Sequence, residues 1–339
     1  AECLEGHSHP LPQAIVKARR MNKIRTTFIE KMIFGHMRNG KIHGQINPLR
    51  SDGGGTVSGR FSYSSPNLQQ VPARDPEFGK MVRDLFVPDG HEYWGAFDYS
   101  QQEPRITVHY AYLTKQLGAE DAVKAYQGQD ADFHQIVADM AGIDRKKAKT
   151  INLGLSYGMG RQKLTQALGL AEDEAETLFS QYHRKVPFIR GLSNSCMRRA
   201  SNKGFITTLL GRKCRFNMYE STTTKSIPLP YDQAVEKWGK EGLIRAYTYK
   251  ALNRLIQGSA ADMTKKAMLD LWKEGYVPYV QVHDELDIGV STKKEIEHIK
   301  EIMENCVTLK VPNVVDAEIG TTWGQATKDY REVLSERNQ

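Results

Sequence analysis

Three separated segments of the sequence carry side chains that together suit chemistry on a nucleotide phosphate. DYSQQEPR begins at Asp98, RKKAKTINLGLSYG begins at Arg145, and VHDE contains Asp284 and Glu285. Carboxylates gather divalent cations and nearby cations bind phosphate, and phosphoryl transfer from a nucleotide requires both. The sequence therefore indicates a phosphoryl-transfer site whose parts come from distant segments of the chain.

Asp98 and Asp284 each lie at the end or bend of an apolar stretch that is typical of a β-strand. Two carboxylates about 4 Å apart repel by roughly 4 kcal/mol at an effective dielectric near ~20. Such a pair either raises a pKa or binds a cation. Mg²⁺ prefers a few carboxylates together with substrate phosphate oxygens, so we expect these two aspartates to bind it. The alternative interpretation is two unrelated surface acids.

The middle segment places cations and an aromatic residue on one side of a helix. Arg145, Lys149, Leu153 and Tyr157 follow one another at intervals of four residues. From first to last they span about 18 Å at a rise of about 1.5 Å per residue. This length suits a nucleotide with its phosphates at the cationic end and its base near Tyr157. A solvated basic helix start is the alternative interpretation, and the absence of GxxxxGK[ST] excludes a P-loop.

The composition describes an ordinary globular protein with a basic balance. Of 339 residues, 40% are hydrophobic and 26% charged, and 47 Lys and Arg against 40 Asp and Glu give a net charge of +7. This balance fits a polyanion-binding protein but also occurs in enzymes that bind no nucleic acid. The four cysteines form no CxxC pair, which disfavours a zinc site. No apolar run is long enough to span a membrane, and no signal peptide is visible.

Helices and strands must hold these residues in place. Apolar residues at helical spacing predict helices over residues 11–34, 133–140, 146–157, 172–186 and 250–273. HEYWGAFDYS and VPYVQVHDELDIGV are typical of strands that end or bend at the two aspartates. Pro104 suits the first turn of a helix after Asp98, and residues 204–230 indicate loops or a hairpin. We therefore predict an α+β fold in which a sheet carries the acids and a mainly helical insertion separates them.

The three segments resemble motifs A, B and C of the family A DNA polymerases, the DNA polymerase I type. Further segments resemble this family in the same order. TVSGRFSYSSPNLQQVP at residues 56–72 resembles its TGR…PNLQNIP segment, and DADFHQIVA around His134 resembles its DIH segment. LNRLIQGSAADMTKKAM at residues 252–268 resembles its Gln helix, and AEIGTTWGQA at residues 317–326 resembles its chain end. The resemblance covers nearly the whole chain.

The resemblance implies a right-hand polymerase fold with an antiparallel-sheet palm, helical fingers and a partial helical thumb. The expected divisions are a partial thumb over 1–40, palm over 41–105, fingers over 106–245, and the second part of the palm with motif C over 246–339. Only 55 residues precede the TGR-like segment, and the chain starts without Met. We therefore expect the polymerase portion of a longer protein, without an exonuclease domain or proofreading in this chain.

The implied reaction adds dNTPs to a primer 3′-hydroxyl by two-metal-ion transfer. Two Mg²⁺ ions, for which Mn²⁺ can substitute, would be held by Asp98, Asp284 and the backbone carbonyl of Tyr99, with Glu285 in support. Lys149 would protonate the leaving pyrophosphate. The expected partners are a DNA primer–template, dNTPs and a possible replisome or processivity protein. The expected protein is a monomer in the cytoplasm of a bacterium or phage-infected host, without a membrane partner.

The family pattern also assigns positions that contact the substrates. The nucleotide-binding residues would be Tyr99, Gln101, Glu103, His134, Arg145, Lys149, Leu153 and Tyr157. The DNA-binding residues would be Arg60, Asn67, Gln69, Arg105, Asn253, Gln257 and His283. Minor-groove contacts of this kind use acceptors that all base pairs share, so they check the shape of a pair without reading sequence. Glu103 would crowd the 2′ position of the sugar and reject ribonucleotides.

Two departures from the family pattern are informative. Leu153 replaces the usual Phe or Tyr and has neither ring nor hydroxyl, which predicts discrimination against dideoxynucleotides. Gln102 and Pro104 replace the typical Ile and Leu and predict a shifted helix geometry with the chemistry retained. Two alternatives stay open, a non-catalytic DNA-binding remnant of a truncated polymerase and a single-subunit RNA polymerase. Glu103 and the HDE sequence at 283–285 argue against the RNA polymerase.

Overall fold

The computed structural model describes residues 4, 8–51, 54–73, 75, 78–127, 132–156, 161–224 and 226–336. Its centre is a five-stranded sheet with the order β11-β12-β5-β13-β14, and the pairs are antiparallel. The strands are β5 (Tyr93–Tyr99), β11 (Val280–Val282), β12 (Glu285–Val290), β13 (Val315–Gly320) and β14 (Lys328–Asp329). The strands expected at the two aspartates are therefore present, and the α+β fold is confirmed.

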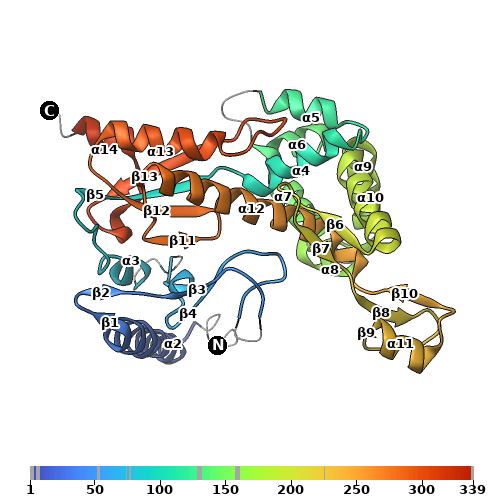
Figure 1. Cartoon of the computed structure of the whole chain (residues 1–339), viewed down its shortest axis with the longest axis horizontal. Helices are drawn as coiled ribbons and strands as arrows, with labels where there is room; N and C mark the ends of the chain where they lie inside the picture. The colour runs from blue at the N-terminus through green and yellow to red at the C-terminus, as the bar shows by residue number, and fades with distance from the viewer. Residues whose placement is uncertain are drawn as a thin grey trace.

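Both faces of β5 are buried except at Asp98, near the end of the strand. The register places Phe97 between Leu286 and Ala317, and all three are buried. These side chains pack with those of α12 (Ala251–Lys273) and α13 (Lys293–Asn305) in the largest hydrophobic cluster. Figure 1 shows both helices running along the sheet. Because successive side chains in a strand point to opposite faces, the neighbouring Asp98 lies on the other face.

Helices make up most of the remaining chain. They are α2 (Pro10–Lys23), the π-helix η1 (Ile24–Phe34), η2 (Leu68–Gln70), α3 (Phe78–Arg83), α4 (Gln102–Leu113), α5 (Ala119–Ala125), α6 (Phe133–Ala141), α7 (Arg145–Ser156), α8 (Arg161–Leu168), α9 (Glu172–Lys185), α10 (Pro187–Lys203), α11 (Tyr231–Trp238), η3 (Thr248–Lys250), η4 (Trp323–Gln325) and α14 (Tyr330–Glu336). The helices expected from apolar spacing therefore form within a few residues of the predicted bounds.

Two features of these helices bear on the predictions. The helix expected over residues 11–34 changes at Ile24 into a π-helix, whose i→i+5 spacing brings Phe28 and Ile33 to one side, where both are buried. Pro104 lies in the first turn of α4, as its missing N–H allows. Gln102 is buried and donates from Nε2 to Thr264 Oγ1 on α12 at 3.2 Å, so this unusual residue has a packing role.

The smaller strands lie outside the central sheet. They are β1 (Met37–Arg38), β2 (Lys41–Ile42), β3 (Gln45–Asn47), β4 (Ser62–Ser64), β6 (Phe205–Thr207), β7 (Lys213–Arg215), β8 (Met218–Ser221), β9 (Leu229–Pro230) and β10 (Leu243–Arg245). β6 and β7 form the hairpin expected after residue 204. β8, β9 and β10 form a separate sheet with α11, and we call residues 218–245 the lobe. Figure 1 shows the lobe projecting beyond one end of α12.

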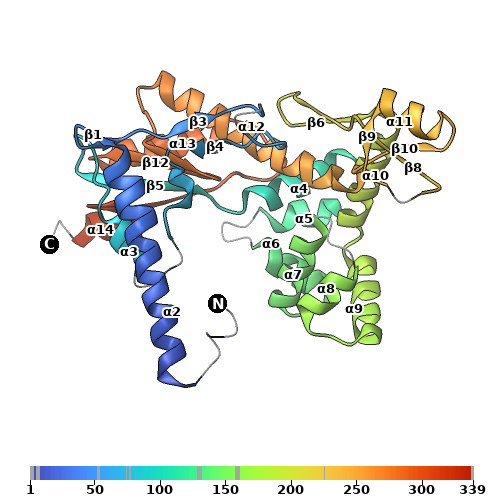
Figure 2. The same cartoon turned by 90° about the horizontal axis from the view of Figure 1, so that it is seen from below.

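The helical parts frame the sheet on one side. Figure 2 shows α2 at one end and α7, α8 and α9 at the other, extending in the same direction and well separated. In the part of the chain that the structure describes, no helix is both long and apolar enough to span a bilayer.

Candidate active site

Carboxylates gather where β5, β12 and β13 lie side by side. Asp98 is directly opposite Glu285 on one neighbouring strand and Asp316 on the other. Residues opposite one another in a sheet have their Cβ atoms about 5 Å apart on the same face. Asp98 is exposed to solvent, whereas Phe97 and Tyr99 on either side of it are buried. The register alone therefore produces a row of three acids.

Asp284 joins this row through a tight turn. His283 and Asp284 connect β11 to β12, because Val282 pairs with Glu285 across the hairpin. The Tyr99 N–H points to the Asp284 carbonyl oxygen at 3.5 Å, which ties the turn to the end of β5. His283 has φ of +61°, a left-handed conformation that is uncommon for a residue other than glycine and is often retained at functional sites. The hairpin thus brings the second predicted aspartate beside the first.

The carboxyl groups of this site have raised pKa values. Although part of Asp98 reaches solvent, protein surrounds much of its carboxyl group. This desolvation, followed by the charges of Asp284, Glu285, Asp316 and Glu318, raises the pKa of Asp98 to about 8. Burial also raises the pKa of Asp284, and that of Glu285, where Asp284 adds to the effect. A bound cation relieves repulsion of this kind. The oxygen-only donor set suits Mg²⁺, although the described residues hold no cluster of three or more His, Cys, Asp or Glu with metal-binding geometry.

An ion pair lies beside the acids. Arg60 donates from its guanidinium to Glu103 Oε1 at 2.5 Å, and both side chains are about four-fifths covered, with 24% and 20% exposed. Glu103 is in the first turn of α4, where the helix dipole favours an acid. Burial raises the pKa of Glu103, Arg60 opposes the shift, and the charge of Asp284 adds to it. Arg60 and Glu103 therefore belong to the same electrostatic site as Asp284.

The cationic helix α7 packs against α6 and brings three predicted residues together. Burial lowers the pKa of His134, and the positive charges of Lys149 and Arg145 lower it further while Asp132 opposes them. Arg145 is paired with Asp132 at 2.5 Å, and Lys149 is exposed. His134 thus shares one site with both cations.

Two residues missed by the sequence reasoning hold this group in place. Asn152 lies on α7 and is buried; its Nδ2 is 3.2 Å from His134 Nδ1, and its Oδ1 accepts from the Tyr182 hydroxyl. Asp132 caps α6 by accepting from the His134 backbone N–H at 2.8 Å. The sequence offered one signal for this role, an Asp two residues before the His at a helix start.

Gln101 connects the acids to α6. It precedes α4 with φ of +54°, and its Oε1 accepts from the Phe133 N–H at 2.6 Å. The ring of Tyr99 lies in the core, where its hydroxyl donates to the Met303 carbonyl at 2.8 Å, so the backbone remains for a metal contact. Leu153 lies on α7 as predicted, and Tyr157 is outside the described residues.

Most of the predicted DNA-binding residues are half-buried. Asn253 and Gln257 are four residues apart on α12 and half-buried, and His283 is exposed. Gln69 donates to the backbone carbonyl and side chain of Gln281 at 3.2 Å. Asn67 accepts from the Gln69 N–H at 3.1 Å, so it shapes the same segment.

Arg105 was predicted to bind DNA, but it is buried in the structure. Its side chain is 3% exposed. The guanidinium donates to the carbonyl oxygens of Ser100 at 2.8 Å and Pro312 at 2.7 Å, and lies over the Tyr126 ring. A buried charge needs such partners, so Arg105 stabilises the join between β5, α4 and the chain before β13 and does not present its charge to DNA.

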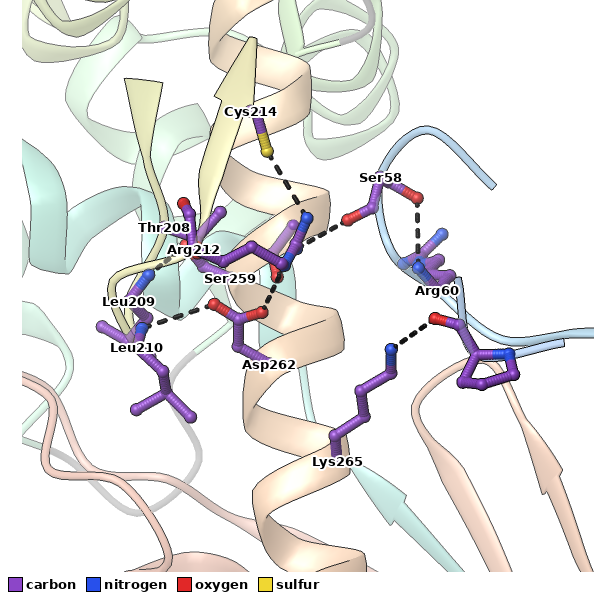
Figure 3. Close-up of polar contacts among 12 residues, drawn as sticks. Ser58, Arg60, Thr208, Leu209, Leu210, Arg212, Cys214, Ser259, Asp262 and Lys265 are labelled. Atoms are coloured by element: carbon purple, nitrogen blue, oxygen red, sulfur yellow. Dashed lines mark hydrogen bonds and ion pairs between the residues drawn. The ribbon is translucent and has the colours of Figure 1, made fainter. Parts of the chain in front are cut away.

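Arg212 is a further residue that sequence reasoning missed. It lies in the turn between β6 and β7 and donates to Asp262 Oδ1 at 2.9 Å and to the carbonyl oxygens of Gly258 at 2.9 Å and Ser58 at 2.7 Å. Figure 3 shows the guanidinium between α12 and the segment that carries Ser58 and Arg60. One side chain thereby links three segments that are far apart in sequence.

Two glycines allow this close approach. A Cβ on Gly59 would lie 2.7 Å from the Arg212 Cζ, and Gly59 has φ of +86°. A Cβ on Gly258 would lie 2.9 Å from an Arg212 nitrogen and 2.8 Å from Thr208 Cγ2. A Cβ at either position would therefore displace the Arg212 guanidinium, and at Gly59 it would also strain the left-handed backbone.

Comparison with known proteins places these features in a family. A family model described as DNA polymerase family A matches residues 1–325. The chain is 40% identical to the DNA-directed DNA polymerase of Pseudomonas phage M6, over 96% of this chain and 53% of that protein. It is 31% identical to the thermostable DNA polymerase I of Thermus filiformis, over 97% of this chain and 38% of that protein. The chain spans about half the length of the phage relatives it matches.

A solved structure agrees with the sequence relatives. The POL domain of Pol1 from M. smegmatis, in complex with DNA primer–template and dNTP, aligns with a TM-score of 0.75 and 28% identity, over 96% of this chain and 55% of that one. This match confirms the expected right-hand polymerase fold. The sequence segments, the sheet that carries the acids and these matches agree, and the chain belongs to DNA polymerase family A.

Proposed function

We propose that this protein is a template-directed DNA polymerase that adds dNTPs to a primer 3′-hydroxyl. The observation that carries the proposal is the meeting of Asp98 and Asp284 at the end of β5, where burial raises the pKa of both and the charge of Asp284 adds to the shift at Asp98. The names of the relatives and the substrates in the solved M. smegmatis complex support the same activity. DNA primer–template and dNTPs are then the partners.

Asp98, Asp284 and the Tyr99 carbonyl would hold the divalent ions, with Glu285 in support. When bound, the ions lower the pKa of the primer hydroxyl and offset charge on the triphosphate and departing pyrophosphate. Arg145 and Lys149 would bind the triphosphate beside His134 and Gln101. Lys149, which is exposed, would give a proton to the pyrophosphate.

Other residues would select and align the substrates. Glu103 would exclude the ribose 2′-hydroxyl, with Arg60 holding its carboxylate in place. Asn253, Gln257, His283 and Arg60 would contact the minor groove or primer end, and Gln69 and Asn67 would shape the neighbouring segment. Leu153 and Tyr157 would lie near the sugar and the templating base.

The proposed divisions follow the elements. Residues 1–40 would form part of a thumb, 41–105 and 246–339 the palm, and 106–245 the fingers. The acids that gather in the described part of the chain belong to one sheet, so we propose that this polypeptide extends primers without proofreading. Release of a labelled mononucleotide from a mismatched 3′ end, retained in an Asp98→Ala variant, would contradict that part. We place the reaction in the cytoplasm of a bacterial or phage-infected cell, as the sources of the relatives suggest.

Primer extension by the purified protein tests the proposal. Asp284→Ala should reduce extension by at least ~1000-fold, about 4 kcal/mol of transition-state stabilisation, and should leave primer–template affinity within about threefold. Asp316→Asn is the matched control, because it removes a carboxyl of the same row that is not a proposed ligand. Normal extension by Asp284→Ala would overturn the metal assignment, and normal DNA binding without extension by the unaltered protein would favour a non-catalytic remnant.

The single-subunit RNA polymerase is less well supported. Glu103 is largely covered and lies beside Asp284, so its carboxylate occupies space next to the reacting centre. Efficient extension with rNTPs by the unaltered protein would favour this alternative.

A further inference from the structure

The positive charge of the chain is concentrated in one part of it. Residues 198–254 contain 12 Lys or Arg and 4 Asp or Glu, a net charge of +8, whereas the whole chain carries +7, so the remainder carries −1. We call residues 198–254 the basic segment. It comprises the end of α10, the β6–β7 hairpin, the lobe, η3 and the first turn of α12. A polyanion approaching the protein is therefore attracted to this part.

Most of these cations face solvent and are not neutralised. The exposed ones are Arg198, Arg199, Lys203, Lys213, Arg215, Lys237, Lys240 and Lys250. Within the described residues, no ion pair joins any of these eight to a carboxylate, whereas Arg212 is paired with Asp262 at 2.9 Å. Many exposed lysines elsewhere have a partner, such as Lys293 with Glu297 at 3.5 Å. The unpaired charge remains available for a ligand.

Exposed tyrosines lie among these cations. Tyr249 is 50% exposed and Tyr231 42% exposed. Lys250 Nζ lies 5.0 Å from the Tyr247 ring centre and 5.5 Å from that of Tyr249. Cationic surfaces with exposed rings bind single-stranded nucleic acid, because unpaired bases stack on the rings while the cations follow the phosphates. Duplex DNA offers no free base face, so the rings favour a single strand.

The hairpin and η3 meet at the start of α12, next to the proposed DNA-binding face. Arg254 donates from its guanidinium to the Arg215 carbonyl at 3.0 Å and lies over the Phe216 ring at 4.4 Å. This contact holds β7 against the first turn of α12. Tyr249 and Lys250 immediately precede this turn in the sequence. Asn253 is in that same turn. A strand on the basic segment would therefore be continuous with DNA at Asn253 and Gln257.

We propose that the basic segment binds the single-stranded part of the DNA template, with Lys213, Arg215 and Lys250 at its phosphates and Tyr249 stacking on a base. The inference rests on the proposed polymerase function, since it names the strand bound beside that site. Binding needs no base-specific contact, so it tolerates any template sequence.

Charge reversal tests the proposal. The double variant Lys213→Glu with Arg215→Glu should weaken binding of a labelled single strand of about 16 nucleotides by about tenfold or more, and should lower the salt dependence by about 0.7 per lost phosphate contact. The matched control is Lys293→Glu with Lys294→Glu on α13, which changes the net charge equally. Fluorescence anisotropy measures both at several salt concentrations. Equal effects of the two double variants would overturn the proposal.

An uncharged variant covers the case in which charge reversal unfolds the hairpin. Tyr249→Ala should weaken single-strand binding severalfold with an unchanged salt dependence, and should leave the affinity for a blunt duplex as it was. Unchanged affinity for the single strand would overturn the stacking contact. If the lobe instead binds a protein, the basic-segment variants should bind DNA as tightly as the α13 control variant does. That result would also overturn the proposal.

The two proposals fail in different ways. Primer extension on a template with one unpaired nucleotide measures the polymerase function and does not need a long single strand. If extension occurs but the basic-segment variants bind single strands like the α13 control, this inference fails and the function stands. If single-strand binding depends on the basic segment but no primer is extended, the polymerase function fails.

Discussion

The carboxyl group of Asp287 is buried two residues along β12 from Glu285, on the same face of the sheet. It is 0% exposed; its Oδ1 accepts from Trp94 Nε1 at 2.6 Å, and its Oδ2 has no partner among the described residues. Burial raises the pKa of Asp287 well above its usual value, with Glu285 and Asp98 adding to the shift while Trp94 and Arg83 oppose it. A carboxyl with a raised pKa keeps its proton in the fold at a pH where the unfolded chain has lost it.

This shift predicts a pH dependence of stability. The contribution of Asp287 is fully present below the unfolded pKa of about 4 and is lost as the pH rises through the higher folded pKa, at about 1.4 kcal/mol per pKa unit. Asp287→Asn keeps an acceptor for Trp94 and does not titrate, so its stability relative to the unaltered protein should increase from pH 4 to pH 8. Urea unfolding across that range measures this. Glu301→Gln removes an exposed carboxyl of α13 and shows the effect of charge loss alone. If the unfolding free energies of the two variants change in parallel with pH, the prediction is contradicted.

Glu103 is expected to control the choice of sugar. Glu103→Ala opens the space beside Asp284 and frees Arg60, so selectivity for dNTP over rNTP should fall by at least ~10-fold, about 1.4 kcal/mol. Glu103→Gln is the matched variant, because it keeps the size and removes the charge. If bulk excludes the 2′-hydroxyl, the Gln variant should stay selective. Single-nucleotide kcat/KM values measure both, and undiminished selectivity in the Ala variant argues against the role.

Leu153 should determine how dideoxynucleotides are used. Its side chain has no hydroxyl to stand in for the 3′-hydroxyl that a dideoxy sugar lacks, so the unaltered protein should prefer dNTPs over ddNTPs. Leu153→Tyr should raise ddNTP use by at least ~10-fold, and Leu153→Phe should not. Competitive chain termination gives the ratios. Comparable incorporation of ddNTP and dNTP by the unaltered protein would contradict this role of Leu153.

At the scale of elements, Arg212 fastens the β6–β7 turn to α12 and to the segment that carries Arg60. Arg212→Ala removes the hydrogen bonds to Asp262, Gly258, Ser58 and Cys214 and leaves Asp262, which is 7% exposed, without its ion-pair partner. We expect a loss of about 2–3 kcal/mol in the free energy of unfolding, together with a raised KM for primer–template. Arg212→Lys keeps the charge but cannot reach all the acceptors, so its effect should be intermediate. Urea unfolding measures the free energies of unfolding of both variants. An Ala variant as stable as the unaltered protein would contradict this linking role.

Local patterns predicted the principal elements well. The expected helices over 133–140, 146–157, 172–186 and 250–273 correspond to α6, α7, α9 and α12, because apolar spacing and N-terminal caps act within a few residues. The lobe was not expected as a sheet with its own helix. Its strands of two to four residues are too short to show alternation, and their pairing depends on contacts that no local pattern reports.

At the scale of the whole molecule, local patterns identified Asp98 and Asp284, whereas contacts between distant segments decide the roles of Arg105 and Arg212. Sequence reasoning found both aspartates, because each ends an apolar strand. It placed Arg105 on DNA, whereas the carbonyl oxygens of Ser100 and of the distant Pro312 hold its guanidinium in the interior. Arg212 carried no signal, because its three oxygen acceptors lie 154, 46 and 50 residues away along the chain.

By itself, the sequence determined which residues have the chemistry: the two aspartates, the cations of α7 and their order along a family A chain. Residue type and spacing suffice for that, since they act locally. Only the tertiary structure decided which of these residues meet. The register of β5 against β12 and β13 aligns Asp98 with Glu285 and Asp316, and packing pairs Arg60 with Glu103 and buries Arg105. Pairing and burial depend on residues that are distant in sequence, so they follow from the folded chain as a whole.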